Sequence, residues 1–181
     1  MGGGGRGAGH GAALSAGDAA LGVCRLSAAR DGRHRAREVA LQLLYQREVG
    51  SLEGADLDAS ISRYWEEHPA PEARQAFTAR LLHGTVAALG DIDPLLEAAA
   101  ENWRLSRMAV VDRTVLRLGA YELLAGAAPA AGGIDEAIEL ARTFSGEEAA
   151  RFVNGVLDGV KRTLEQRATS AGRPDDAETA Q

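Results

Sequence analysis

The part of this sequence that decides the fold is one stretch, Val111-Asp112-Arg113-Thr114-Val115-Leu116-Arg117-Leu118-Gly119-Ala120-Tyr121-Glu122-Leu123. Its apolar residues, with Met108 before it and Leu124 after it, recur at helical spacing but cover most of a helix circumference. A helix that is apolar on so many sides needs neighbours on all of them. We therefore predict that this helix lies at the centre of the fold.

Further helical periods flank this stretch, and none of the sequence predicts a convincing strand. Aromatic residues make up only 4 % of the 181 residues, so alanine and leucine, which favour helices, must fill the interior. Ser106 is expected to cap the central helix, and Ser145 with Glu148 has the pattern of a capping box. We predict an all-α bundle of about seven helices, over residues 33–49, 58–67, 72–89, 92–103, from 106 on, from 134 on and from 146 on.

Composition divides the chain into three parts. Residues 1–32 are rich in glycine and alanine, without a stable period, and are predicted to be disordered. Residues 33–168 form the helical domain, and the polar residues 169–181 are predicted to be a disordered tail. Cys24 is the only cysteine and no apolar run reaches the length of a membrane span, so we expect a cytoplasmic protein.

A dense cationic cluster, Arg33-His34-Arg35-Ala36-Arg37, opens the first predicted helix of a protein whose net charge is -6. In a helix Arg33 and Arg37 share a face, because they lie four residues apart. A concentrated positive site on an acidic body favours a local nucleic-acid contact. The alternative, that these arginines are solvated side chains at the start of a helix, stays open at this point.

Catalytic chemistry finds no support in the sequence. The four histidines and Cys24 lack metal-binding spacing, and there is no phosphate-binding glycine loop or nucleophile elbow. Acidic pairs such as Glu147-Glu148 are typical of first-turn helix charges. We predict a protein without enzymatic activity, metal or cofactor.

Three motifs, in order, carry a resemblance to a known family. They are the central stretch quoted above, the leading Ala36-Arg37-Glu38-Val39-Ala40-Leu41-Gln42-Leu43-Leu44-Tyr45, and Ile134-Asp135-Glu136-Ala137-Ile138-Glu139-Leu140-Ala141-Arg142 continued by Arg151-Phe152-Val153-Asn154-Gly155-Val156-Leu157-Asp158. Over about residues 33–161 the chain strongly resembles the transcription antitermination factors of the NusB family.

The resemblance implies an all-helical fold of two small helical subdomains and a non-enzymatic role. Members of this family bind the boxA element of nascent ribosomal RNA together with the small-subunit ribosomal protein NusE, within the elongation complex of RNA polymerase. The expected partners are therefore single-stranded boxA-type RNA, NusE and that complex. A monomer and a homodimer both remain open.

Carried over position by position, the resemblance implies an RNA-binding site and a contact to NusE. Asp112 matches an acidic position in the interface with the ribosomal protein. His34 replaces a usual Arg or Lys, the loop residues 130–133 lack basic and β-branched residues, and Asp135 replaces a usual asparagine. The expected RNA-binding residues are Arg33, His34, Arg35, Arg37, Tyr45, Glu148, Arg151 and Phe152.

Other interpretations of these residues stay open. Tyr45 and Phe152 are expected to stack on bases, but each can also be a core residue. Arg151 can pair with Glu147 or Glu148, and Asp112 can be an exposed helix charge.

Two other functions are also consistent with the sequence. The same helical domain precedes the catalytic part of certain ribosomal RNA cytosine methyltransferases. A stand-alone interaction protein for ribosome assembly, which has lost its RNA contacts, is the other possibility.

Overall fold

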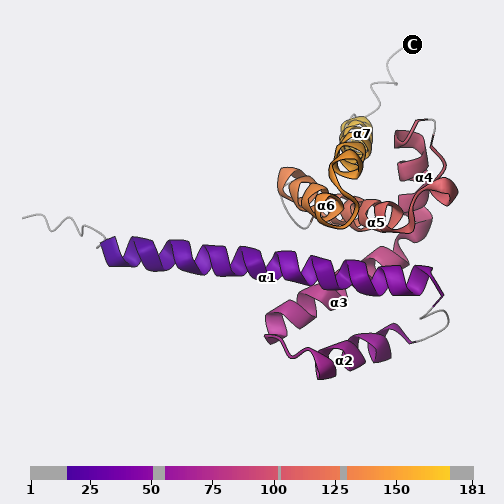
Figure 1. Cartoon of the computed structure of the whole chain (residues 1–181). Coiled ribbons are helices and arrows are strands. Elements are labelled where there is room, and N and C mark those ends of the chain that lie inside the picture. Colours follow the sequence, from indigo (N-terminus) through magenta and orange to yellow (C-terminus); the bar gives the residue numbers. More distant parts are fainter. Residues whose placement is uncertain (1–15, 51–55, 102, 127–129, 172–181) are drawn as a thin grey trace, which may run out of the picture. The chain divides into compact units, whose positions relative to one another are not determined.

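The computed structural model describes residues 16–50, 56–101, 103–126 and 130–171. The chain forms two compact units, residues 1–32 and 33–181, and the account below concerns the second. Within the described residues every regular element is helical, which confirms the all-α prediction (Figure 1). The elements are α1 (Ala16–Glu48), α2 (Leu57–Glu67), α3 (Glu72–Ala87), α4 (Leu89–Ala99), the short 3₁₀ helix η1 (Leu105–Arg107), α5 (Val110–Leu124), α6 (Ala130–Ser145) and α7 (Glu147–Ala171).

Helix boundaries differ from the prediction at both ends of the chain. α1 begins at Ala16 and not at Arg33, so part of the segment predicted to be disordered is helical. Alanine, leucine and arginine are strong helix formers, and in this segment they outweigh the scattered glycines. α7 extends to Ala171, into the predicted tail, and residues 1–15 and 172–181 lie outside the described residues.

Three internal boundaries also differ. Gly90 and Asp91, expected to separate two helices, lie within α4, and the chain turns at Ala88 instead. Ser106 does not cap the central helix, because it belongs to η1 and Ala109 precedes α5. The loop predicted up to Gly133 ends earlier, since α6 begins at Ala130; residues 127–129 lie outside the described part.

The junction between α6 and α7 is made by Gly146 and not by the predicted capping box. Gly146 has a φ of 95°, in the left-handed region that glycine adopts without a steric penalty. Its N–H donates to the carbonyl oxygens of Ala141 and Arg142, which closes the end of α6. Ser145 is consequently the last residue of α6, and α7 starts directly after the glycine.

α5 lies at the centre of the fold, as predicted. It contacts α3, α4, α6 and α7, and its residues Val115, Leu116 and Ala120 are completely buried. Close approach depends on small residues: a Cβ added to Gly119 would lie 2.8 Å from a methyl carbon of Leu157 on α7. None of the described helices is long and apolar enough to cross a membrane.

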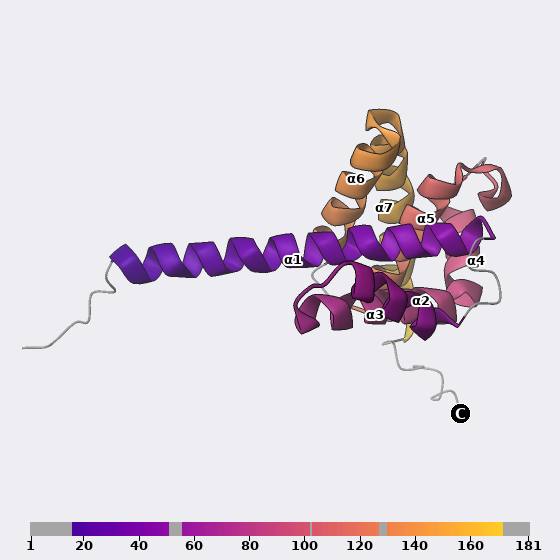
Figure 2. The same ribbon diagram turned by 60° about the horizontal axis from the view of Figure 1, so that its bottom comes forward.

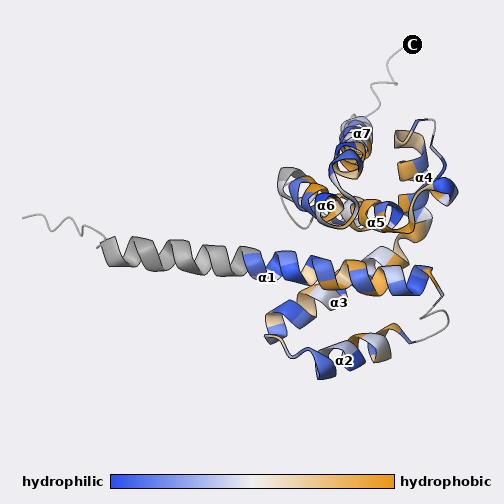
Figure 3. Ribbon diagram, viewed as in Figure 1, coloured by the Kyte–Doolittle hydropathy of each residue, from blue (hydrophilic) through white to orange (hydrophobic). Residues whose placement is uncertain are grey.

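Within the second unit, residues 33–48 of α1 lie between two groups of helices. α2 and α3 lie on one side, and α4, α5, α6 and α7 on the other (Figures 1 and 2). Thr78 of α3 donates a hydrogen bond of 3.3 Å to the carbonyl oxygen of Ala36. Arg37 pairs with Glu122 of α5, so α1 is tied to both groups. Figure 3 shows a polar start to this part of α1, followed by mixed apolar and polar residues.

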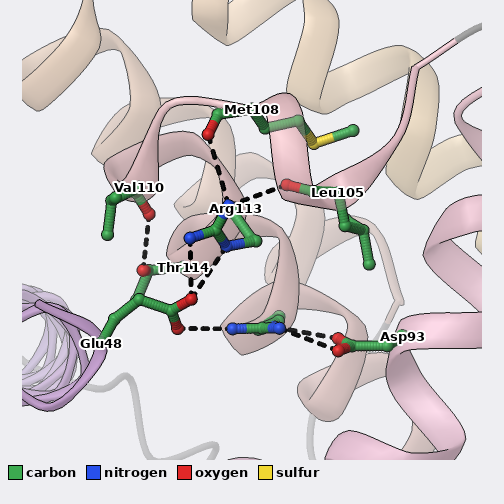
Figure 4. A network of polar contacts seen from close by, with 8 residues as sticks. Glu48, Asp93, Leu105, Met108, Val110, Arg113 and Thr114 are labelled. Carbon is green, nitrogen blue, oxygen red and sulfur yellow. Dashed lines mark hydrogen bonds and ion pairs between the residues drawn. The ribbon is translucent and has the colours of Figure 1, made fainter.

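An ion-pair network fixes the other end of α1. Glu48 accepts hydrogen bonds from Arg113 and Arg117 of α5, and Arg117 also binds both carboxylate oxygens of Asp93 on α4 at 2.8 Å (Figure 4). Arg113 additionally donates to the carbonyl oxygen of Leu105 in η1. Burial opposes the charge of Arg117, but the hydrogen bonds and charges of Asp93 and Glu48 outweigh it and raise the pKa of the guanidinium. The network therefore connects α1, α4, α5 and η1.

A candidate nucleic-acid interface

The cationic cluster at residues 33–37 is split by the geometry of α1. Successive helical residues are about 100° apart, so Arg33 and Arg37 share a face while Arg35 points to nearly the opposite side. His34 points in a third direction, toward α6. The four charged or titratable side chains of the cluster therefore do not form one continuous surface.

Arg37 is not open to solvent, whereas the sequence favoured a phosphate contact at this position. The residue is 5 % exposed, and its guanidinium binds the carboxylate of Glu122 bidentately, with Nε and Nη2 at 2.9 and 2.8 Å from the oxygens. Glu122 itself is 4 % exposed, and Glu136 lies 3.6 Å from Nη1 of Arg37. The guanidinium is occupied inside the fold, so Arg37 orients the start of α1 against α5.

Arg33 is exposed and lies over the ring of Phe77 on α3, with its Cζ 5.7 Å from the ring centroid. Arg37 approaches the same ring at 5.2 Å, and Arg80 of α3 approaches it at 4.9 Å. Arg80 is exposed as well. Three guanidinium groups therefore surround one aromatic ring, and two of them are open to solvent.

His34 is engaged by carboxylates and not presented freely. Its Nδ1 lies 2.9 Å from Oε2 of Glu136 on α6, and its Nε2 lies 3.5 Å from Oε1 of Glu38 one turn along α1. The ring therefore lies between one acidic group of α6 and one of its own helix. Any RNA contact by His34 would have to compete with them.

Arg35 belongs to the outer face of α1. At helical spacing it shares this face with Glu38, Gln42 and Tyr45, which lie three, seven and ten residues further on. Arg35, Gln42 and Tyr45 are exposed. Between Arg35 and Tyr45 the face is roughly 15 Å long.

An apolar groove runs beside this outer face. Its volume is about 480 Å³, and two of its lining residues, Tyr45 and Phe144, are 38 % and 50 % exposed. Burial, helped by the charge of Glu38, raises the pKa of the Tyr64 phenol in the groove. The residues that line it are Glu38, Val39, Leu41, Gln42, Tyr45, Tyr64, Val111 and Phe144.

The start of α7 presents a second aromatic surface. Phe152 is half-buried and packs edge to face with Trp103, at 5.8 Å between ring centroids, and Trp103 is 59 % exposed. Glu148 and Arg151 are exposed beside it on the first turns of α7. Glu147 pairs with Arg142 of α6, whereas Arg151 has no carboxylate within 4.0 Å among the described residues. Arg151 is thus open to solvent, and the alternative interpretation, in which it pairs with Glu147 or Glu148, does not apply.

Asp112 lies half-buried in the first turn of α5, one residue after the groove residue Val111. Its Oδ1 is buried and has no hydrogen-bond partner within the described part of the chain. A buried carboxylate oxygen without a donor is costly, so a donor from outside the chain would stabilise it.

Sequence reasoning missed three residues of this surface: Arg80, Trp103 and Phe144. Trp103 had a signal, since a tryptophan beside polar residues at a predicted helix end is a good candidate for an exposed aromatic. Phe144 and Arg80 had none, because only the packing of α6 and α3 against α1 brings them to the site. Among the described residues, no three His, Cys, Asp or Glu side chains gather as a metal site would require.

Comparison with known proteins agrees with this architecture. The model of the NusB family matches residues 34–162, and the chain belongs to that family. It is 42 % identical over 134 residues to the transcription antitermination protein NusB of Solibacter usitatus (strain Ellin6076), covering 73 % of this chain and 90 % of the relative. For the NusB protein of Anaeromyxobacter sp. (strain Fw109-5) the identity is 45 % over 140 residues, with 76 % and 96 % covered.

Solved structures show the same fold. NusB of T. maritima superposes with a TM-score of 0.65 at 36 % identity, covering 72 % of this chain and 90 % of that one. A chain from a crystal structure of the antitermination factors NusB and NusE in complex with dsRNA also has a TM-score of 0.65, at 24 % identity, with 74 % and 98 % covered. The chain is accordingly a non-enzymatic transcription antitermination factor, which confirms the resemblance and the prediction that it is not an enzyme.

Proposed function

We propose that this antitermination factor binds boxA-type single-stranded RNA of nascent ribosomal transcripts, together with the ribosomal protein NusE. It would act in the cytoplasm, on elongation complexes of RNA polymerase. The relative solved with NusE and dsRNA supports the choice of RNA and NusE as partners.

The observation that carries the proposal is the open charge at the start of α1. Arg33 and Arg35 are exposed, and within the described residues neither has a carboxylate within 4.0 Å. On a protein of net charge -6 these two groups form a local cationic site. Such a site attracts phosphates while the acidic body repels nucleic acid elsewhere.

The two aromatic surfaces provide the rings on which the bases of the RNA would stack. Single-stranded RNA exposes its bases, and base stacking on aromatic side chains contributes about 1–3 kcal/mol per base. Tyr45 with Phe144, and Trp103 with Phe152, each offer an exposed aromatic edge or face. Phosphates would contact Arg35 and Arg151, and bases would stack on these rings, with Glu148 beside them. Arg37 and His34 would support the site by holding α1 in place.

Asp112 is our candidate for a contact to NusE. Its unpartnered Oδ1 is the kind of acceptor that a basic or polar side chain of a partner would satisfy.

Fluorescence titration of labelled boxA-type RNA and a scrambled sequence, each with and without NusE, tests the proposal. We expect tighter binding of the boxA-type RNA and a further gain when NusE is present. Each phosphate contact to a single strand contributes about -0.7 to the log-log salt slope. For a boxA-type RNA long enough to reach both arginines, the double variant Arg33→Gln/Arg35→Gln should therefore flatten the slope by about 1.4.

The exposed Arg162 on α7 provides the matched control, since Arg162→Gln changes the net charge without touching the site. Equal affinity for both RNA sequences, or a double variant that behaves like this control, would refute the proposal. Binding that appears only with NusE would favour the interaction protein over an autonomous RNA binder.

A further inference from the structure

We propose that Arg33 and Arg80, held over the ring of Phe77, form a second phosphate-binding subsite, at which the RNA strand continues from α1 onto α3. This inference rests on the proposed function and extends it to a helix that sequence reasoning left out of the site.

The geometry that points to this subsite is the gathering of three guanidinium groups on one ring. The Cζ atoms of Arg33, Arg37 and Arg80 lie 5.7, 5.2 and 4.9 Å from the centroid of Phe77. Two of these groups come from α1 and one from α3. The hydrogen bond from Thr78 to the carbonyl oxygen of Ala36 holds the two helices together at this level.

Charge distinguishes the three groups. Arg37 is buried and neutralised by the bidentate pair with Glu122. Arg33 and Arg80 are exposed, and within the described part of the chain neither has a carboxylate within 4.0 Å. Two uncompensated cations kept near one ring repel each other, and an anion between them would relieve the repulsion.

The chemistry of guanidinium favours phosphate as that anion. A guanidinium over an aromatic ring interacts through its planar face, which leaves the N–H donors at its edge available. Those edge donors match the oxygens of a phosphate in a bidentate arrangement. Phe77 thus orders two long side chains, so that less conformational entropy is lost when a phosphate binds.

The subsite lies on the side of α1 away from Arg35. Arg33 and Arg35 project to nearly opposite sides of a helix whose diameter with side chains is about 10–12 Å. An RNA that contacts both arginines must pass around α1, so it must extend a few nucleotides beyond the part that lies on the outer face. RNA length therefore becomes a way to separate the two contacts.

The test uses the full chain and boxA-type oligonucleotides of core length, or extended by a few nucleotides at the 5′ or the 3′ end. Affinity and salt slope are measured for the wild type, Arg80→Gln, Arg80→Lys and the control Arg162→Gln. For one of the extended RNAs we expect Arg80→Gln to weaken binding about three- to tenfold and to flatten the slope by about 0.7. Arg80→Lys should keep the slope, and core-length RNA should bind all variants alike.

The inference is overturned if Arg80→Gln matches Arg162→Gln on every RNA, or if extension of the RNA does not strengthen binding. Failure of the proposed function looks different. If the wild type binds boxA-type and scrambled RNA equally, the boxA assignment is refuted. If Arg80→Gln still flattens the salt slope in the same titration, the subsite proposal stands. Absence of RNA binding by the wild type would overturn both.

Discussion

At the scale of the residue, Arg37 shows how one side chain can match a binding motif and still serve the fold. Its place in an arginine-rich segment favoured a phosphate contact, but its guanidinium is paired with Glu122, 85 residues further along the chain. Removing one partner of a buried ion pair leaves the other charge without compensation inside the protein.

Glu122→Gln is therefore expected to lower the free energy of unfolding by about 3 kcal/mol, because the buried guanidinium of Arg37 loses its counter-charge. Urea denaturation measures this change. Glu139→Gln, which breaks an exposed pair with Arg142, is the control and should leave the midpoint unchanged. Similar effects of the two variants would show that the Arg37 pair is not the anchor of α1.

Gly84 is a second residue whose role follows from one contact. A Cβ built at this position would lie 2.0 Å from the ring of Tyr121 on α5, so α3 and α5 can approach this closely only with glycine here. Gly155, by contrast, has no atom within 4 Å of an added Cβ.

We expect Gly84→Ala to destabilise the protein by about 1–3 kcal/mol through overpacking. Gly155→Ala should instead stabilise it by up to about 1 kcal/mol, because alanine favours the helix. If the packing is as described, thermal unfolding shows a lower melting temperature for Gly84→Ala and a higher one for Gly155→Ala. A shift in the same direction for both would contradict it.

At the scale of the element, the end of α1 depends on charges from two other helices. Arg117 links Glu48 of α1 to Asp93 of α4, and the fork of its guanidinium serves both carboxylates. Lysine carries the same charge but lacks this fork.

Arg117→Lys is consequently expected to lower the free energy of unfolding by about 2 kcal/mol, since hydrogen bonds to charged groups contribute about 1.5–3 kcal/mol each and lysine can serve only one carboxylate well. Chemical denaturation measures the loss. Arg107→Lys, at an exposed position in η1, is the comparison and should have no effect. Wild-type stability in Arg117→Lys would mean that charge alone suffices.

At the scale of the whole molecule, the residues whose burial the structure describes place the core within residues 33–181. The residues described as buried run from Ala36 to Val160. We therefore expect a chain of residues 33–181 to unfold at the same temperature as the full chain and to keep its RNA affinity. Calorimetry and RNA titration check this; a large drop in either would assign residues 1–32 a role in the domain.

The sequence by itself determined the helical class, the central position of α5 and the family. These follow from local information, because helical periodicity and the order of motifs are properties of neighbouring residues. Local information also explains the errors at the junctions. Whether Ser145 or Gly146 forms the junction after α6 depends on the backbone conformation there. The φ of 95° at this point favours glycine.

Only the tertiary structure decided which charged and aromatic residues are open to a ligand. Arg33, Arg35 and Arg37 are alike in sequence, yet one lies over Phe77, one is solvated and one is buried against Glu122. Arg80 and Phe144 join the surface because α3 and α6 pack against α1. Pairing and exposure depend on residues far apart in the chain, and a cation is available to RNA only where folding has left it without an internal carboxylate.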